Sequence, residues 1–144
     1  MKALEGGRIN IASCSLGGAA FCIEAAKLHL QNRRKFGNPL SQFQHLQFKL
    51  ADMATDLVTS RLLVRKAATL YPLQNEQSQL TSSMCKLRAS QLCYSIADSA
   101  LQMHGGYGYL TEYGIEKYVR DLRAHMIAGG SVEIKLYISF RKYY

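Results

Sequence analysis

The chain has 144 residues, of which 48% are apolar and 19% are charged, and it contains only two prolines. A chain of this length can bury a substantial core, and the composition excludes the disordered and collagen-like classes. We therefore expect one globular domain covering residues 1–144, without a linker or a low-complexity tract.

The formal net charge is +8, from 18 Lys and Arg residues against 10 Asp and Glu residues. Such a surface attracts anions such as phosphates, nucleotides or an acidic partner. The basic residues are scattered along the chain, however, and no zinc-finger or RNA-motif pattern accompanies them. The sequence therefore predicts no nucleic-acid partner.

Cysteine spacing and hydropathy indicate the cellular setting. Cys14 and Cys22, and Cys85 and Cys93, are each eight residues apart, which we interpret as buried thiols on helix faces in a reducing compartment. No C-x-x-C spacing occurs. No run approaches the ~18 consecutive apolar residues of a membrane span, so we expect none. Residues 1–5 show no targeting signal.

Apolar residues recur every three or four positions from Ile9 and predict a helix from Ile9 to about Arg34. Small residues between positions 12 and 20 would let another helix, or a flat ligand, come close to this face. The segment 36–40 should end this helix, because its proline, Pro39, disfavours a helical residue before it and cannot donate a helical hydrogen bond.

Ser41 is the predicted N-cap of a second helix, because Ser41-x-x-Gln44 fits a capping box. This helix should end near Tyr71-Pro72. A polar loop over residues 73–79 then leads into a third helix, which should stop at Gly105.

Two glycine pairs separate the remaining segments. A helix is predicted over residues 115–126 after Gly105-Gly106, and Ser131 should cap a last helix after Gly129-Gly130. No alternating β-branched run occurs. The predicted fold is all-α: an up-down four-helix-type bundle with a short extra C-terminal helix.

General motif searches assign no chemistry. The four histidines lack the spacing of metal ligands, so no metal site is expected. Gly105-Gly106-x-Gly108 follows a predicted helix rather than a strand, which excludes a dinucleotide-binding fingerprint. These patterns alone indicate a basic helical domain with glycine-lined helix ends.

Longer motifs are more informative, because six of them occur in one order and spacing. They are Leu4-Glu5-Gly6-Gly7-Arg8-Ile9, Arg33-Arg34-Lys35-Phe36-Gly37-x-Pro39-Leu40, Gln44-x-Leu46-Gln47-x-x-Leu50-Ala51-Asp52-Met53, Gln102-Met103-His104-Gly105-Gly106-Tyr107-Gly108-Tyr109, Glu116-Lys117-Tyr118-Val119-Arg120-Asp121 and Gly130-Ser131-x-Glu133-Ile134. Together they resemble the C-terminal α-domain of acyl-CoA dehydrogenases. The short- and branched-chain members, isobutyryl-CoA dehydrogenases especially, look nearest.

The resemblance implies a flavoprotein domain. Family members use FAD to remove a proton from the α-carbon and a hydride from the β-carbon of an acyl-CoA, and pass the electrons to an electron-transfer flavoprotein. The resemblance also implies a homodimer or homotetramer, in which the bundle holds part of the neighbouring subunit's FAD, and a mitochondrial matrix location. We expect the N-terminal helical and middle β-domains of such enzymes to be absent from this chain.

Site residues follow by motif. The implied cofactor-binding residues are Arg33, Phe36, Gln44, Gln102, Gly106, Ser131 and Glu133. Arg33 would contact the pyrophosphate, for which its fork of donors is suited, and Gln44 would reach the adenosine end. A capping box is the alternative role for Gln44, and a merely solvated charge is the alternative for Arg33.

Glu5 and Arg8 resemble the family's Leu-Asp-x-x-Arg element, which lies along the acyl-CoA, with Glu in place of Asp. The resemblance therefore implies substrate binding by these two residues. A frayed N-terminal turn is the alternative.

Both usual positions of the family's catalytic carboxylate hold glycine. Most members place a Glu where Gly129 stands, and the isovaleryl and long-chain members place it where Gly7 stands. The residues after Ile134 match the family best if one residue is missing there, which would rotate the following residues by about 100°. The catalytic residue is therefore unassigned, and whether the chain is an enzyme stays open.

Two hypotheses follow. In the first, the chain is the FAD-binding and oligomerisation domain of an acyl-CoA dehydrogenase-like flavoprotein and is inactive by itself. In the second, it is a catalytically silent helical module for interaction or oligomerisation.

Overall fold

Five α-helices make up most of the computed structural model, which describes the backbone of residues 3–143 and the side chains of residues 4–140. The helices are α1 (Ala3–Asn32), α2 (Gln44–Leu70), α3 (Glu76–His104), α4 (Ile115–Ile127) and α5 (Val132–Tyr143). For these residues the all-α prediction is confirmed, and the predicted helices occur at nearly the predicted positions.

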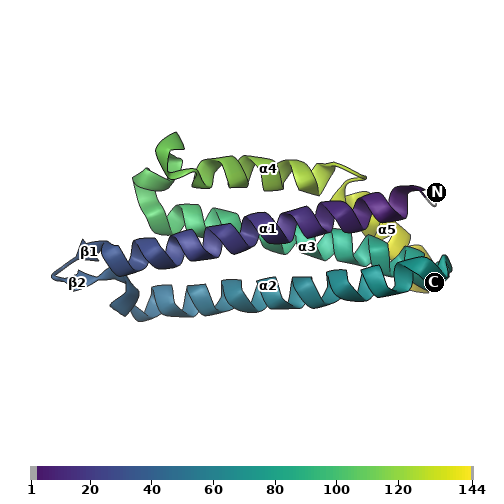
Figure 1. Cartoon of the computed structure of the whole chain (residues 1–144), viewed down its shortest axis with the longest axis horizontal. Coiled ribbons are helices and arrows are strands. Elements are labelled where there is room, and N and C mark those ends of the chain that lie inside the picture. The colour runs from purple at the N-terminus through teal and green to yellow at the C-terminus, as the bar shows by residue number, and fades with distance from the viewer. Residues whose placement is uncertain (1–2, 144) are drawn as a thin grey trace.

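The long helices α1, α2 and α3 lie side by side along the long axis of the molecule, and α4 runs alongside α1 and α3 (Figure 1). Helices α1 to α4 run alternately in opposite directions, as predicted for an up-down bundle. The short helix α5 packs against α3 at the end where α1 begins. Because α3 contacts all four other helices, it forms the centre of the fold.

Small buried side chains dominate the contact between α1 and α3. The largest group of buried apolar residues includes Ala19, Cys22 and Ala26 of α1 and Cys93, Ala97 and Ala100 of α3. Side chains of this size let two helix axes approach closely. Of the small residues predicted between positions 12 and 20, Ala12 and Ala19 are fully buried in such apolar groups, so helix packing is the role that the structure gives these two.

Gly18 extends this packing to α4. A Cβ atom at Gly18 would lie 3.2 Å from the Tyr118 ring and 3.6 Å from the Leu122 side chain. Tyr118 also stacks on Phe21 of α1, with ring centroids 4.6 Å apart. The absence of a side chain at Gly18 therefore allows α4 to lie directly on α1.

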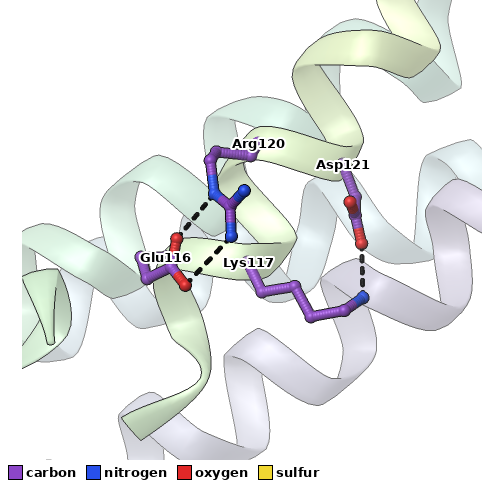
Figure 2. Close-up of polar contacts among 4 residues, drawn as sticks. All are labelled: Glu116, Lys117, Arg120 and Asp121. Atoms are coloured by element: carbon purple, nitrogen blue, oxygen red, sulfur yellow. Dashed lines mark hydrogen bonds and ion pairs between the residues drawn. The ribbon is translucent and has the colours of Figure 1, made fainter. Parts of the chain in front are cut away.

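The outer face of α4 carries two ion pairs at i, i+4 spacing (Figure 2). Arg120 donates two hydrogen bonds to Glu116, at 2.7 and 3.2 Å, and Lys117 donates one to Asp121. Opposite charges at this spacing favour the helix. In the described structure, the motif from Glu116 to Asp121 thus supplies a paired, solvated helix face.

A short β-ribbon follows α1 and was not predicted. Strands β1 (Arg34–Lys35) and β2 (Asn38–Pro39) pair antiparallel around Phe36 and Gly37, whose φ angles are 53° and 83°. Two consecutive residues with positive φ form the type of two-residue turn that suits a hairpin. Strands of two residues are too short to produce an alternating pattern, which is why the sequence showed no sign of them.

The predicted capping box at Ser41 is wrong. Ser41 lies inside a 3₁₀ turn (Leu40–Gln42), and α2 begins at Gln44 after Phe43, whose backbone is extended. An N-cap residue needs that extended backbone, and Ser41 does not have it. Gln47, rather than Gln44, bonds this turn, by donating to the Ser41 carbonyl at 2.9 Å.

The loop before the third helix is shorter than predicted. A 3₁₀ turn (Tyr71–Leu73) follows α2, and α3 already begins at Glu76. Asn75 is its N-cap, because the Asn75 side chain accepts a hydrogen bond from the Ser78 amide at 3.0 Å. The polar residues before position 80 therefore form the first helical turn.

The cysteine prediction is correct for three residues and wrong for Cys14. Cys22, Cys85 and Cys93 are buried, whereas Cys14 is exposed. Eight residues in a helix correspond to a rotation of about 80° beyond two full turns. On α1 this rotation brings Cys14 out of the core, while the more fully surrounded α3 buries both of its cysteines.

Helix α1 is long and apolar enough to match a membrane span by composition, with a mean hydropathy of 1.4 over its best 18-residue window in Leu4–Asn32. A core helix of a bundle meets the same criterion, and 44% of this window is buried within the structure. The consecutive-run criterion used on the sequence did not detect this property.

Gly108 lies in the 3₁₀ turn Gly105–Tyr109 that follows α3, where a Cβ atom would come within 2.6 Å of the Leu101 carbonyl oxygen. We predict that Gly108→Ala lowers the free energy of unfolding by about 1–3 kcal/mol, because a backbone atom has to move. Gly106→Ala in the same turn meets no atom within 4 Å and should have little effect. Urea denaturation followed by circular dichroism measures both, and equal effects would contradict the prediction.

Candidate functional site

A shallow pocket of about 280 Å³ lies at the ribbon end of the bundle. It brings together three of the predicted cofactor residues, Arg33, Gln102 and Gly106. Arg33 directly follows α1, whereas Gln102 and Gly106 flank the end of α3. The contact between α1 and α3 thus unites residues that are about 70 positions apart in the chain.

Arg33 is held in place on this pocket by its backbone and by an aromatic ring. Its amide donates to the His29 carbonyl at 2.8 Å, and its carbonyl accepts from the Leu40 amide at 2.8 Å. Its guanidinium carbon lies 5.3 Å from the centre of the Tyr107 ring, within the range of a cation–π contact. Arg33 is therefore fixed more firmly than a merely solvated charge.

Two histidines form part of the pocket wall. The rings of His29 and His104 lie 4.3 Å apart, and His104 Nδ1 lies 2.7 Å from the Ala100 carbonyl oxygen. Because a carbonyl only accepts, Nδ1 of His104 carries a proton. Burial, and then His104 and Arg33, lower the pKa of His29. Arg33 and Lys35 both line this pocket and give it positive charge.

A second pocket, of about 540 Å³, lies between α2 and α3 and is also lined by Gln102. Its lining includes the charged residues Lys49 and Asp98. Gln44 is exposed at the first position of α2 and does not line either pocket in the described structure. Gln102 thus lines both pockets, whereas Gln44 lines neither of them.

Phe36 lies at the tip of the β-ribbon and not in a pocket. Its side chain is 91% exposed, and its ring meets only the edge of Phe43 among the ring contacts described, at 6.4 Å between centroids. Its φ of 53° is unfavourable for a residue with a bulky side chain. The ribbon therefore holds an aromatic side chain in solvent at a conformational cost.

The other two predicted cofactor residues, Ser131 and Glu133, lie at the opposite end of the bundle, where α4 joins α5 (Figure 1). The Ser131 carbonyl accepts a hydrogen bond from the Lys135 amide at 3.2 Å, as expected of the residue before a helix. Hydrogen bonding by the Ser131 side chain, the largest influence, lowers the pKa of Glu133.

Two buried lysines meet the backbone in the same turn, and sequence reasoning missed both. The Lys86 ammonium donates to the carbonyls of Met126 and Gly130, at 3.0 and 2.7 Å. Lys135 Nζ lies 2.7 Å from the position that a Cβ atom of Gly130 would occupy. Lys86 is 0% exposed and Lys135 1% exposed. Helical spacing could have shown their inward direction, since Lys135 lies three residues after the buried Val132 and Lys86 directly follows the buried Cys85.

Glu5 and Arg8, the predicted substrate residues, are turned into the bundle. Arg8 Nη1 donates to Ser83 Oγ at 3.1 Å, and Ser78 Oγ donates to Glu5 Oε2 at 3.3 Å. Both residues belong to α1, which is helical from Ala3, so the alternative of a frayed N-terminal turn is wrong. Glu5 Oε1 and Arg8 Nε are buried without a hydrogen-bond partner in the described structure.

The two groups of predicted cofactor residues lie far apart. Gly130, which directly precedes Ser131, bonds to Lys86 in the first half of α3. Gln102, from the other group, lies near the end of α3. At 1.5 Å per residue these two positions on α3 are about 24 Å apart. A compact ligand could not contact both groups within one copy of the chain.

The two positions at which the resemblance expects a catalytic base are open. No heavy atom lies within 4 Å of a Cβ atom built at Gly7 or at Gly129, and Gly129 has a φ of 69°. Among the described residues, moreover, no cluster of three or more His, Cys, Asp or Glu side chains could hold a metal ion.

Comparison with known proteins identifies the family. The family model described as acyl-CoA dehydrogenase, C-terminal domain, matches residues 1–143. The chain belongs to the acyl-CoA dehydrogenase family. A mitochondrial isobutyryl-CoA dehydrogenase of Bos taurus is 53% identical over 134 residues, which cover 93% of this chain and 32% of that protein.

Solved structures of acyl-CoA dehydrogenases share the fold. The butyryl-CoA dehydrogenase of Megasphaera elsdenii matches with a TM-score of 0.92 and 34% identity, over 97% of this chain and 36% of that one. A chain in a structure of the electron transferring flavoprotein of Acidaminococcus fermentans matches with a TM-score of 0.92 and 36% identity, over 97% of this chain and 37% of that one. This acyl-CoA dehydrogenase domain thus spans about a third of the length of its relatives.

Lys135 should make the stability of this acyl-CoA dehydrogenase domain depend on pH. Burial, followed by Arg8 and Lys86, lowers its pKa from 10.5 to about 8. The unfolded state then binds more protons between these two values, so stability rises with pH in that window. The free energy of unfolding should increase by about 2 kcal/mol between pH 7.5 and 9.5 through this group.

The buried thiols act in the opposite direction. Burial raises the pKa of Cys22, Cys85 and Cys93 to about 12, from 9.0, so they reduce stability as the pH rises above 9. We therefore predict that the unfolding free energy of the unmodified protein, minus that of Lys135→Met, rises with pH. The cysteine contributions cancel in this difference. Guanidinium denaturation at several pH values measures it, and a difference independent of pH would contradict the prediction.

Proposed function

We propose that this chain is the C-terminal FAD-binding and oligomerisation domain of an acyl-CoA dehydrogenase-like flavoprotein. The reaction of such a protein would be the α,β-desaturation of a short or branched acyl-CoA. The observation that carries the cofactor proposal is the pocket in which Arg33, Gln102 and Gly106 converge from two helices. Family membership supplies the reaction class.

The residues of this pocket suit the pyrophosphate of FAD. Arg33 offers a fork of hydrogen-bond donors from a fixed position, and Lys35 adds a second positive charge. Gly105 and Gly106 present bare backbone, with no atom within 4 Å of a Cβ position. When bound, the flavin would supply the hydride-accepting chemistry that no side chain supplies.

The second group, Ser131 and Glu133, follows Gly130, which bonds to Lys86, and Lys86 is about 24 Å from Gln102 along α3. We infer that the two groups contact different flavins of an oligomer: the Arg33 group contacts the cofactor of a neighbouring subunit, and the Ser131 group contacts the cofactor of its own. The exposed Phe36 and Gln44 support this arrangement, since both point away from the bundle core. A homodimer or homotetramer would satisfy it.

Substrate binding by Glu5 and Arg8 stays a prediction. Both side chains bond to serines of α3 in the interior. An acyl-CoA would therefore meet them only after the first turns of α1 move away from Ser78 and Ser83. Glu5 Oε1 and Arg8 Nε, which have no partner in the described structure, are the atoms that such a movement would make available.

Partner and location follow from the relatives. One matching chain lies in a structure of the electron transferring flavoprotein of Acidaminococcus fermentans. This match supports electron transfer from this protein to such a flavoprotein. The name of the Bos taurus relative supports a mitochondrial location, in the matrix.

Glycine at positions 7 and 129 favours absence of activity in the isolated chain. Neither position can take up the α-proton, and no other carboxylate has been assigned to this step. The second candidate function, a catalytically silent interaction module, rests on the same observation. Flavin binding distinguishes the two candidates, because only the first requires it.

We predict that the purified chain, supplied with FAD and a dye acceptor, does not oxidise isobutyryl-CoA. The physical reason is the missing base at both usual positions. Dye reduction dependent on both FAD and substrate would contradict this. A full-length acyl-CoA dehydrogenase assayed in parallel shows that the assay reports activity.

We predict further that the chain binds FAD and that Arg33→Met weakens binding at least tenfold. One charge-assisted hydrogen bond to a phosphate is worth about 1.5–3 kcal/mol, which corresponds to roughly 10-fold to 100-fold in affinity. Arg34→Met is the matched control, since it removes the same charge from an exposed neighbouring residue. Flavin fluorescence titration at fixed salt measures the dissociation constants.

Equal weakening by both substitutions would indicate general charge attraction and contradict a specific Arg33 contact. Absence of FAD binding in the unmodified chain would contradict the cofactor proposal and favour the silent module.

A further inference from the structure

Two buried lysines lie on the inner side of the turn between α4 and α5, residues 128–131, and one of them, Lys86, bonds to it. Lys86 of α3 donates to the Met126 carbonyl in the last turn of α4 and to the Gly130 carbonyl just before α5. One ammonium group therefore connects the end of one helix to the start of the next.

The chemistry of a helix end explains the first of these bonds. The last carbonyls of an α-helix have no partner within the helix, and a positive charge near them is favourable. Lys86 provides both a donor and a charge at Met126. Its bond to Gly130, at 2.7 Å, then fixes the chain four residues later, after Ala128 and Gly129 have left the helical conformation.

Lys135 approaches the same glycine with its own ammonium group. A Cβ atom at Gly130 would lie 2.7 Å from Lys135 Nζ and 3.2 Å from its Cε, and the φ of Gly130 is 96°. Position 130 therefore needs glycine for two reasons, the backbone conformation and the space taken by Lys135. The two lysine side chains consequently meet at one residue.

Charged groups from every surrounding helix act on this pair. Arg8 of α1 and Lys86 of α3 oppose a positive charge on Lys135. Glu133 of α5 favours the charge on Lys86, and Arg8 opposes it. Glu5 of α1 favours the charge on Arg8, and His125 of α4 lies within the influence of Lys86. Cations thus outnumber carboxylates in a largely buried cluster.

We propose that Lys86 is a positioning residue that fixes the α4–α5 turn, and that the protonation state of Lys135 controls how firmly it does so. With Lys135 charged, the two ammonium groups repel each other across Gly130. Loss of the Lys135 proton removes this repulsion and strengthens the bond from Lys86 to the Gly130 carbonyl. We call the two bonds from Lys86 to the carbonyls of Met126 and Gly130 the clamp. The clamp does not require a flavin.

The clamp also has a consequence that rests on the proposed function. Ser131 and Glu133 are the first and third residues after Gly130, which Lys86 holds. Lys86 would therefore set the direction from which these two residues meet a cofactor. Loss of Lys86 should therefore disturb the Ser131 group and leave the Arg33 pocket, at the other end of α3, intact.

The test follows the ¹³C chemical shift of the Gly130 carbonyl by NMR in flavin-free protein, from pH 7 to 9.5. This shift responds to the hydrogen bond that the carbonyl accepts. In the unmodified protein we expect a titration with a midpoint near 8, the pKa of Lys135. Lys135→Met should abolish the titration. Lys66→Met, which alters an exposed lysine of α2, should leave it unchanged.

Substitutions at position 86 test the positioning role itself. Lys86→Met should shift the Gly130 carbonyl and lower amide protection in residues 128–131 at least tenfold more than in α2. Lys86→Arg keeps a donor and a charge and should restore part of the protection. An unchanged Gly130 shift in Lys86→Met would overturn the clamp.

A titration that persists in Lys135→Met would overturn the control by Lys135. If Lys86→Met does not fold, the Lys135 and Lys66 variants still test the control by Lys135. Lys86→Arg then tests the positioning role of Lys86. Because no flavin is present, these results are independent of the FAD experiments with Arg33.

Discussion

The close contact between α1 and α3 is the constraint on which the other features depend. Alanine and cysteine side chains fill this interface, including Ala19 and Ala26 against Ala97 and Ala100, so the helices approach closely along most of their length. The contact places the end of α1, and with it Arg33, beside the end of α3. A larger side chain in the interface would separate the helices and widen the pocket at their end. The predicted cofactor site is thus a product of core packing.

At its other end the same interface changes from apolar to polar. Arg8 bonds to Ser83, and one turn farther into α3 the buried Lys86 bonds to the α4–α5 turn. Burial of charge without compensation is costly, and here the compensation comes from serine hydroxyls, backbone carbonyls and Glu5. The lowered pKa of Lys135 shows that this compensation is incomplete. The polar end therefore ties four helices together, but its stability is sensitive to protonation.

The sequence was sufficient where the 3.6-residue period dominates and insufficient where tertiary contacts decide. The long helices, the stop at Gly105 and the all-α fold follow from local patterns. Ser41 failed as a cap because a 3₁₀ turn after Pro39 used its backbone, which a capping motif cannot reveal. Lys86 and Lys135 were missed because lysine is rarely buried, and Lys86 finds its partners only in the last turn of α4 and in the turn that follows it. Arg33, Gln102 and Gly106, which the resemblance implied as cofactor residues, line one pocket, whereas the burial of Glu5 and Arg8 depends on serines of α3 that no motif includes.

The Arg33 pocket and the turn that contains Gly129, where the resemblance expects a catalytic base, lie toward opposite ends of α3. The Arg33 pocket depends on the α1–α3 contact and on Tyr107, none of which involves the turn after α4. Gly129 lies in that turn with open space around its Cβ position, while its neighbour Gly130 is fixed by Lys86. Glycine in place of the expected glutamate at position 129 therefore loses no packing contact at the Cβ position, because no atom lies near it. A chain of this fold can consequently lack the expected base and still keep both the turn geometry and the pocket, which is the combination that the flavin-binding and turnover experiments are designed to detect.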